Sequence, residues 1–258
     1  MKFNHLYVVV DSSTFLAIKN ELTKTQFANI DKGLPRFAPP DSNSNRMYIR
    51  GRQTYLEIMS SNNAYNEPEG KIGLGFSFDT RLPFNADISE RTATKDCPEF
   101  KEHDAHYTFN DSKILWYKAY YTERQSNLPT WYAFYHPEFL NTVFSKGTDI
   151  YNRETFLEAG YSAEKPFTDI AAIELACNPE DYIAITNEWK CLGIQASSVS
   201  EEEERYMIDR VELVLRRIDN GNSSISRIKL AAKNERLENK HIGKVQLIGD
   251  PTGLSMIF

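Results

Sequence analysis

Three segments of the chain share one pattern, in which an alternating apolar strand runs into an acidic or amide residue placed to cap a helix. In the first, residues 3–10 lead to Asp11, and apolar residues then recur at helical spacing. In the second, residues 72–78 lead to Asp79, with a weaker helix expected after Pro83. In the third, residues 170–177 lead to Asn178, and proline stands at the first position of a helix that ends near Gly193. The repetition predicts an α+β protein built from similar units.

Aligning the three caps divides each strand into two faces, because successive side chains of a strand point to opposite sides. Leu6, Leu74 and Ile173 fall together and are expected to face the helices. The other face carries large polar side chains only in the first segment, at His5 and Tyr7. A functional site is therefore expected on the face of the first unit that lies opposite its helix, which we call the open face.

A hairpin is expected next, with strands at 46–50 and 53–59 joined by a two-residue turn at Gly51 and Arg52. This turn predicts that Tyr48 lies opposite Tyr55 and that Arg46 lies opposite Glu57. The alternation also places Arg50 on the open face with these residues, beside His5 and Tyr7.

The remaining patterns extend the repeat to the end of the chain. Strands are expected at 107–109, 114–121 and 130–136, a short helix at 154–159, and further strands at 207–218, 227–232, 245–248 and 254–258. The predicted organisation is a pair of units over 1–165, made of 1–68 and 69–140 with a connection over 141–165. A third unit with strand, helix and three further strands is expected over 166–258.

Composition and charge exclude several classes of protein. The 258 residues hold 30 basic and 36 acidic side chains, a net charge of −6, with no basic stripe, so nucleic acid is not an expected partner. No apolar run approaches the roughly 20 residues of a membrane span, and no membrane partner is expected. The three cysteines predict buried thiols and a cytoplasmic location. A homodimer is compatible with the sequence and is not specified by it.

The repeated unit resembles the vicinal oxygen chelate superfamily, which includes glyoxalase I, extradiol dioxygenases and bleomycin-resistance proteins. The residues that carry the resemblance are stretches 4–11, Tyr55-Leu56-Glu57-Ile58, 73–79 and 128–131, and the likeness is greatest to glyoxalase-like proteins with a third unit. The resemblance implies curved mixed sheets that form a half-barrel around a small-molecule site.

The resemblance also implies a divalent metal, Zn, Fe, Mn or Ni, held by ligands on the first and last strands of each unit. His5 and Glu57 occupy those positions in the first unit, with Glu57 as the candidate catalytic residue, whereas the second unit has Gly73 and, displaced to a strand end, His136. Glu174 is an alternative third ligand. The glycine-lined second strand is expected to leave room for a substrate.

Two kinds of function follow from these residues. One is a metal-dependent lyase, isomerase or dioxygenase. The other is a metal-free module that binds or sequesters a small molecule, or a scaffold whose site has decayed. Both functional readings use an open-face pocket with four substrate-contacting side chains: Tyr7, Tyr48, Arg50 and Tyr55. Glycine-rich phosphate loops are absent from the sequence, so no nucleotide cofactor is expected. Arg50 is a candidate to hold an anionic group.

Overall fold

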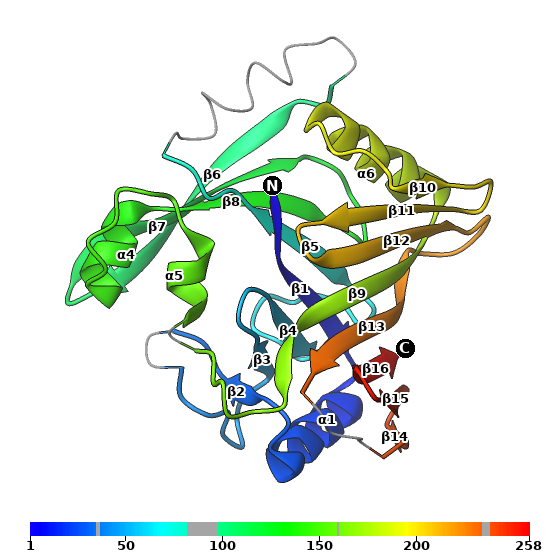
Figure 1. The fold of residues 1–258 in the computed structure, drawn as a ribbon, viewed down its shortest axis with the longest axis horizontal. Helices are drawn as coiled ribbons and strands as arrows, with labels where there is room; N and C mark the ends of the chain where they lie inside the picture. Colours follow the sequence, from blue (N-terminus) through cyan, green and yellow to red (C-terminus); the bar gives the residue numbers. More distant parts are fainter. Residues whose placement is uncertain (35–36, 82–96, 159, 234–237) are drawn as a thin grey trace.

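The computed structural model describes residues 1–34, 37–81, 97–158, 160–233 and 238–258, and the chain in these ranges forms two eight-stranded mixed sheets (Figure 1). The N-terminal sheet has the order β2-β3-β4-β1-β5-β8-β7-β6, and the C-terminal sheet has the order β10-β11-β12-β9-β13-β16-β15-β14. The α+β class and the curved mixed sheets expected from the repeat are confirmed. None of the described helices is long and apolar enough to cross a membrane.

The N-terminal sheet consists of two sets of four strands. Their bounds are β1 Lys2–Val10, β2 Asn29–Asp31, β3 Arg46–Arg50, β4 Tyr55–Ser60, β5 Ile72–Ser77, β6 Phe100–Phe109, β7 Ser112–Thr122 and β8 Thr130–Tyr135. Helix α1, Ser12–Thr25, follows β1, and helices α4, Pro137–Phe144, and α5, Arg153–Glu158, follow β8. The helix expected after Pro83 lies outside the described residues.

The C-terminal sheet repeats the strand order of the N-terminal sheet. Its elements are β9 Phe167–Cys177, α6 Pro179–Cys191, β10 Ser198–Val199, β11 Glu203–Ile208, β12 Val211–Arg217, β13 Ser224–Ala232, β14 Lys240–Ile242, β15 Val245–Asp250 and β16 Gly253–Ile257. The range predicted as one third unit, 166–258, holds two sets of four strands, of which the first is β9 and β10–β12 with α6. The last four strands form a further set in the same sheet.

Local sequence explains where the two long helices begin. Asp11 accepts a hydrogen bond from the backbone N–H of Thr14, and Asn178 accepts one from the backbone N–H of Asp181, so each cap satisfies a free donor of the first turn. Asp79, the third aligned residue, instead accepts from the backbone N–H of Arg153 and pairs with Lys2.

One apolar core joins the helix-covered faces of both sheets, and helices α1 and α6 each contact both sheets. Leu6, Leu74 and Ile173 are fully buried in it, as the alignment predicts. Trp189 of α6 packs edge-on against Phe76 of β5, at 5.7 Å between ring centroids. Helix α1 in turn lies beside β14–β16, as Figure 1 shows.

A buried carboxylate reinforces the contact between α6 and the N-terminal sheet. Glu188 is 1% exposed and accepts hydrogen bonds from the hydroxyls of Thr122, Thr130 and Tyr132. Because three donors satisfy the buried charge, this polar group fixes how the helix docks onto the sheet rather than weakening the core.

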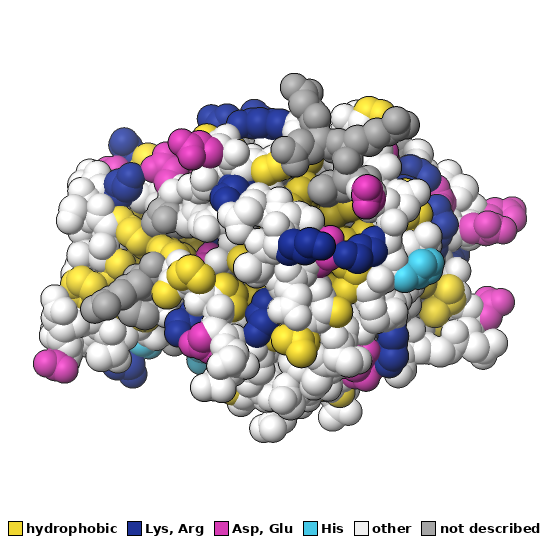
Figure 2. Space-filling view, turned by 90° about the horizontal axis from the view of Figure 1, so that it is seen from below, with side chains coloured by type: hydrophobic (Ala, Val, Ile, Leu, Met, Phe, Trp, Pro, Cys, Tyr) yellow, Lys and Arg dark blue, Asp and Glu magenta, His cyan; other side chains and the backbone are white. Residues whose placement is uncertain are grey.

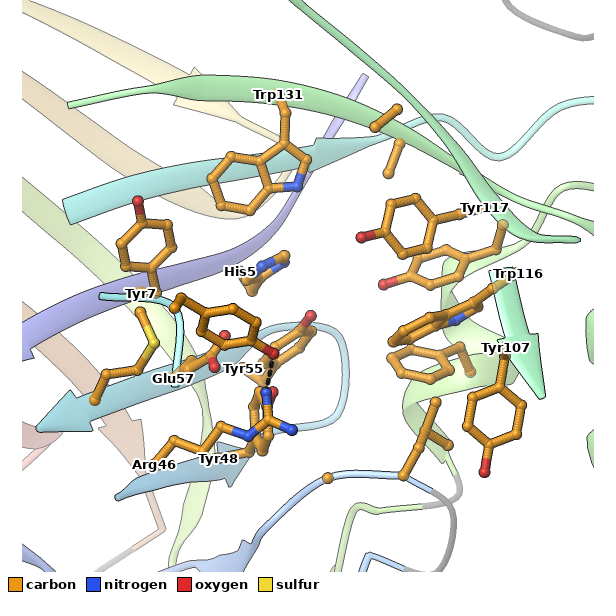
Figure 3. Close-up of a pocket in the computed structure, with 18 of the residues that line it drawn as sticks. His5, Tyr7, Arg46, Tyr48, Tyr55, Glu57, Tyr107, Trp116, Tyr117 and Trp131 are labelled. Atoms are coloured by element: carbon orange, nitrogen blue, oxygen red, sulfur yellow. Dashed lines mark hydrogen bonds between the residues drawn. The ribbon is translucent and has the colours of Figure 1, made fainter. Parts of the chain in front are cut away.

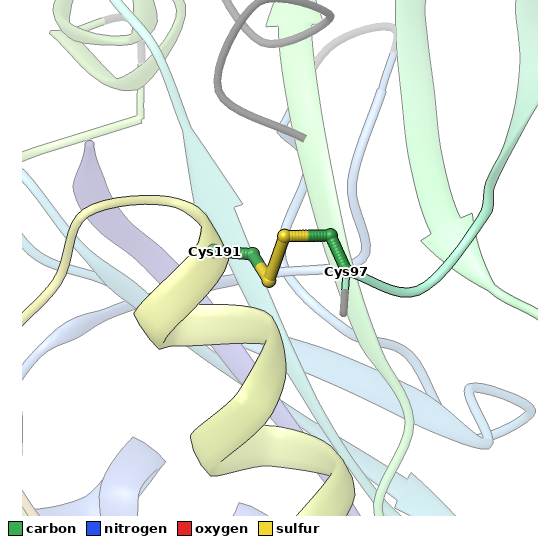
Figure 4. The surroundings of a disulfide bond; sticks show 2 residues. All are labelled: Cys97 and Cys191. Carbon is green, nitrogen blue, oxygen red and sulfur yellow. A yellow bond between two sulfur atoms is a disulfide. The ribbon is translucent and has the colours of Figure 1, made fainter. Parts of the chain in front are cut away.

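A disulfide also joins the two sheets and corrects the expectation of three free thiols. Cys97, just before β6, is bonded to Cys191 at the end of α6 (Figure 4), while Cys177 is a buried thiol. The two cysteines are 94 residues apart, so no local spacing pattern indicates the pair. Disulfides persist in oxidising compartments, and the argument for a cytoplasmic location from cysteine usage therefore no longer holds.

The hairpin of β3 and β4 has a longer turn than expected. Tyr48 pairs with Glu57, Arg50 with Tyr55 and Arg46 with Met59, so the predicted pairing is wrong by two residues. The reason is outside the hairpin: Asp169 at the start of β9 accepts hydrogen bonds from the backbone N–H groups of Gln53 and Thr54, which draws both residues into the turn. A shift of two residues keeps every side chain on its predicted face.

Candidate functional site

The open face of the N-terminal sheet contains a cavity of about 580 Å³, which we call the aromatic cavity (Figure 3). Half of its lining residues are Tyr, Trp or Phe, and the others are four acidic or basic side chains, two histidines and five small or apolar residues. The residues are His5, Tyr7, Gly33, Leu34, Arg46, Tyr48, Arg50, Tyr55, Glu57, Met59, Tyr65, Glu67, His103, Tyr107, Trp116, Tyr117, Ala119, Tyr121, Trp131, Ala133, Tyr135 and Phe156. This volume lies within the range of small-molecule sites.

Strand register places one row of cavity side chains next to another. In the first row, Arg50, Tyr55, His5, Gly75 and Trp131 lie on adjacent strands from β3 to β8. The His5 ring stacks on Tyr55 with 4.3 Å between centroids and meets Trp131 edge-on at 4.9 Å. The imidazole is therefore held between two aromatic rings.

Glycine on β5 makes this stack possible. A Cβ atom at Gly75 would come within 2.7 Å of the His5 ring and 2.8 Å of Trp131, and one at Gly73 would come within 2.2 Å of Tyr7. The expectation that these glycines leave room for a substrate is wrong, since the rings of His5, Tyr7 and Trp131 already occupy that space.

His5 remains a neutral imidazole at physiological pH. Burial, with the positive charge of Arg50 as a smaller cause, lowers its pKa from 6.5 to about 3. Its Nδ1 lies 2.9 Å from Asn4 Oδ1, an acceptor that also receives the Tyr135 hydroxyl. With Nδ1–H donated to that oxygen, Nε2 carries the lone pair and can accept a hydrogen bond from a ligand.

Arg50 does not present a free guanidinium to the cavity. Its Nε and Nη2 donate to the carboxylate of Asp31 at 2.8 and 3.2 Å, and the two side chains are 3% and 0% exposed. The rings of Tyr48 and Tyr55 cover the guanidinium, with centroids at 4.5 and 4.7 Å. A bidentate, buried pair of this kind is electrically neutral toward a ligand.

The second row runs from Tyr48 through Glu57 to Tyr7 and Gly73. Glu57 is half-buried, and burial raises its pKa, although Arg46 and a hydrogen bond from the Tyr48 hydroxyl act in the opposite direction. Burial together with the charges of Glu67 and Glu57 also raises the pKa of Tyr7, so its phenol stays neutral. His5 and Glu57 thus stand in neighbouring rows on one wall.

The other candidate ligands lie elsewhere. His136 is not part of the cavity lining: its Nδ1 accepts from the backbone N–H of Glu138 and caps α4. Glu174 lies on the C-terminal sheet and is paired with Arg216 and Arg227.

The described side chains around His5 and Glu57 do not supply enough ligands for a divalent metal. Among the described residues no group of three or more His, Cys, Asp or Glu side chains is close enough to hold an ion. The second-unit positions that would face His5 and Glu57 carry Gly73, Gly75 and Ala133, which offer no side-chain ligand. Two side-chain donors are fewer than the three usual in a catalytic metal site, so the described residues do not fit the implied metal.

Sequence reasoning missed several residues that shape the cavity. Asp31 neutralises Arg50, Asn4 fixes the His5 imidazole, and Phe156 of α5 stacks on Tyr135 at 4.8 Å. Asp31 lies in a three-residue strand, and Asn4 stands where the β1–β5 register shifts. Neither position is marked by a periodic pattern.

The structure is thus an α+β protein with two mixed sheets and a cavity on the open face of one of them. The chain belongs to the family of unknown function DUF5829, whose model matches residues 3–256. No curated protein matches the sequence.

Three solved structures are similar over most of this chain. A hypothetical protein from Staphylococcus aureus has a TM-score of 0.53 at 9% identity, over 98% of this chain and 96% of its own. A fusion of a xylose isomerase-like TIM barrel with a 4-hydroxyphenylpyruvate dioxygenase has a TM-score of 0.49 at 11% identity, over 90% and 36%. The Mn(II)-bound glyoxalase from Novosphingobium aromaticivorans has a TM-score of 0.49 at 8% identity, over 98% and 80%. At such identity, the likeness to the Staphylococcus aureus protein concerns the fold alone.

Proposed function

We propose that this protein binds a small organic molecule with a planar or apolar body in the aromatic cavity, without a resident metal. The observation that carries the proposal is a concave site of about 580 Å³ in which stacked rings surround the neutral imidazole of His5. Such walls stabilise a flat apolar body by burial and ring contact, while a few polar groups set its orientation.

The polar groups divide into an acceptor and several donors. His5 Nε2 is available as an acceptor, and the Tyr7 and Tyr117 hydroxyls are donors whose raised pKa keeps the proton in place. Tyr107, Trp116 and Phe156 form the far wall from β6, β7 and α5. A suitable ligand donates a hydroxyl or N–H group to His5 Nε2. Its ring then lies between His5 and the far wall.

A metal-free site is favoured over a metal-dependent enzyme by the donor set described above. The enzyme hypothesis, with His5 and Glu57 as ligands and Glu57 as catalytic group, remains a prediction with its own measurement. Metal analysis of protein purified without an affinity tag decides it: one equivalent of metal, lost on His5→Ala, would overturn the metal-free proposal.

Tryptophan fluorescence provides the binding test. Trp116 and Trp131 line the cavity, whereas Trp189 is buried in the core between the sheets, so Trp189→Phe removes the unrelated signal. Titration of this variant with 2-naphthol is expected to give saturable quenching. Adding His5→Ala is expected to weaken the affinity about 5- to 10-fold through loss of one hydrogen bond.

The matched control is Glu174→Gln on the open face of the C-terminal sheet, which is expected to leave the 2-naphthol affinity as it is. Absence of saturable quenching by 2-naphthol, or equal affinity in the His5→Ala and parent proteins, would contradict a binding site at this cavity.

A further inference from the structure

Glu57 is an acidic side chain on which the charge of Arg46 acts only from a distance, without a direct ion pair among the described residues. Its strand neighbours on the open face are Tyr48 on one side and Tyr7 on the other. Among the described residues no basic nitrogen lies within 4.0 Å of its carboxylate, although the predicted register would have placed Arg46 opposite to it. The register shift of two residues thus leaves a half-buried carboxylate facing the aromatic cavity.

The two arginines of the cavity wall are held by other groups. Arg50 is paired with Asp31, as described above. Arg46 donates through Nη1 to the Tyr65 hydroxyl, and its guanidinium lies 5.4 Å from the Tyr65 ring centroid and 5.8 Å from that of Tyr48. Figure 3 shows Arg46 at the edge of the site, with Glu57 beside Tyr7.

Most charges of the cavity lining are compensated by a direct ion pair. The Arg50 and Asp31 pair contributes no net charge, and Glu67 has Lys71 within 4.0 Å. Within the described part of the chain, the lining charges without a direct ion pair are those of Arg46, which donates to the Tyr65 hydroxyl, and Glu57. Glu57 is therefore the acid of the lining that has room for a cation of the ligand beside it.

Aromatic faces beside an unpaired carboxylate are the chemistry that recognises organic ammonium groups. The ring quadrupole attracts a cation placed over the face, and the attraction grows where water is excluded. Tyr7, Tyr48, Tyr117 and Trp131 present rings to the same cavity as Glu57, and burial keeps the tyrosines neutral.

We propose that the aromatic cavity selects an organic cation, a primary or alkylated ammonium on an apolar or aromatic body, with the ammonium held against Glu57 between Tyr7 and Tyr48. This inference rests on the proposed binding function and names the class of its ligand. The apolar body then extends toward His5 and Trp131, in the first row, where the rings are stacked.

Three probes with one ring system and different charges test the selection. They are 2-naphthylmethylammonium, 2-naphthylmethanol and 2-naphthoate, titrated calorimetrically into the full chain near neutral pH. The ammonium is expected to bind at least 10-fold more tightly than the alcohol, and the carboxylate more weakly than both. Glu57→Gln is expected to bring the affinity ratio of ammonium to alcohol close to one.

Two further variants separate loss of charge from loss of structure. Glu57→Asp keeps the charge and is expected to restore most of the preference for the ammonium, while Glu174→Gln, a carboxylate change on the other sheet, is expected to leave the preference as in the parent. Circular dichroism checks that each variant is folded.

The outcomes distinguish the two proposals. Equal binding of all three probes, or tightest binding of 2-naphthoate, would overturn the cation selection and leave the binding function standing. Failure of every probe to bind would overturn both. A preference for the ammonium that persists in Glu57→Gln would also overturn the assignment, because it would place the cation elsewhere.

Discussion

The open faces of the two sheets have the same strand order and opposite distributions of side-chain size. On the N-terminal sheet, β1 carries the large side chains His5 and Tyr7, and β5 carries glycine beside them. At the same positions of the C-terminal sheet, β9 carries Ala172 and Glu174, and β13 carries Lys229 and Arg227.

This difference decides which sheet has a site. Rings from β1 lean over the glycines and form one wall of a cavity, whereas the long cations of β13 lie among carboxylates. Arg227 and Arg216 pair with Glu174, and Lys229 lies 3.6 Å from Asp250. Exposed ion pairs are compatible with contact to water. The same strand order therefore yields a cavity on the N-terminal sheet and a solvated surface on the C-terminal sheet.

On the side seen in Figure 2, basic and acidic side chains are interspersed. The contrast between the two sheets is therefore one of desolvation, and the strongest test compares a buried charge pair with an exposed one.

The largest difference is expected when one acid is removed from each sheet. Asp31→Ala leaves the buried guanidinium of Arg50 without its partner and is expected to lower the free energy of unfolding by about 3–5 kcal/mol. Glu203→Ala, which removes the partner of Arg205 and Arg216, is expected to have a much smaller effect. Urea denaturation measures both, and similar losses would show that the two open faces are equally solvated.

Breaking the covalent link between the sheets is expected to have the next largest effect. Cys97→Ser with Cys191→Ser removes a crosslink that spans 94 residues and is expected to lower the unfolding free energy by about 2–4 kcal/mol. Dithiothreitol is expected to lower the melting temperature of the parent and to leave that of the double variant unaltered. A parent protein insensitive to reductant would contradict this role.

A methyl group added to β5 should distinguish the packed face from the solvated one. Gly75→Ala crowds the rings of His5 and Trp131 and is expected to cost about 1–3 kcal/mol and to weaken 2-naphthol binding. Lys229→Ala, at the equivalent position of β13, is expected to stay within about 0.5 kcal/mol of the parent. If calorimetric melting shows equal costs, the ring stack is looser than the register indicates.

The smallest loss of stability is expected when either helix cap is removed. Asp11→Ala and Asn178→Ala are each expected to cost about 1 kcal/mol near neutral pH, because each leaves a backbone donor of the first turn unpaired. Hydrogen bonds from Ser13 and Thr14 lower the pKa of Asp11, with a small contribution from Lys244.

Only the Asp11 cap should depend on pH, because the Asn178 side chain does not titrate. Since the pKa of Asp11 is lower in the folded chain than in the unfolded chain, its carboxylate stabilises the fold above the unfolded pKa of about 3.9, and the benefit is lost as the pH falls through the folded pKa. The deficit of Asp11→Ala is expected to shrink toward about pH 2, while that of Asn178→Ala stays constant. A constant deficit in both variants would contradict a charged cap at Asp11.

Periodicity and capping predict much of this fold from the sequence. Leu6, Leu74 and Ile173 were assigned to the core because a strand alternates strictly, and Asp11 and Asn178 were assigned as caps because their side chains satisfy donors of the next turn. These are local properties. The placement of His5, Tyr7, Tyr48, Tyr55 and Glu57 on one cavity wall follows from the same alternation.

What local pattern cannot predict depends on contacts between distant segments. Asp169 lengthens the β3–β4 turn from 115 residues away, Asp31 neutralises Arg50 across two strands, and Cys97 finds Cys191 only after the sheets have docked. Each of these contacts changes a property that the sequence alone assigns to a single residue: the pairing of Glu57, the free charge of Arg50 and the free thiol of Cys97. The ligand that we propose changes accordingly, from the anion that the sequence suggests at Arg50 to a cation at Glu57.

The sharing of helices between the sheets has a consequence for synthesis of the chain on the ribosome. The back of β5 and β8, with Phe76 and Tyr132, becomes covered by Trp189 and Glu188 only when α6 has emerged. At about 5–20 residues per second, the 94 residues from Cys97 to Cys191 take roughly 5–20 s to make. For that interval the nascent N-terminal sheet carries an uncovered apolar surface, and the disulfide partner of Cys97 has not yet been made. We expect such a surface to favour the binding of chaperones during synthesis.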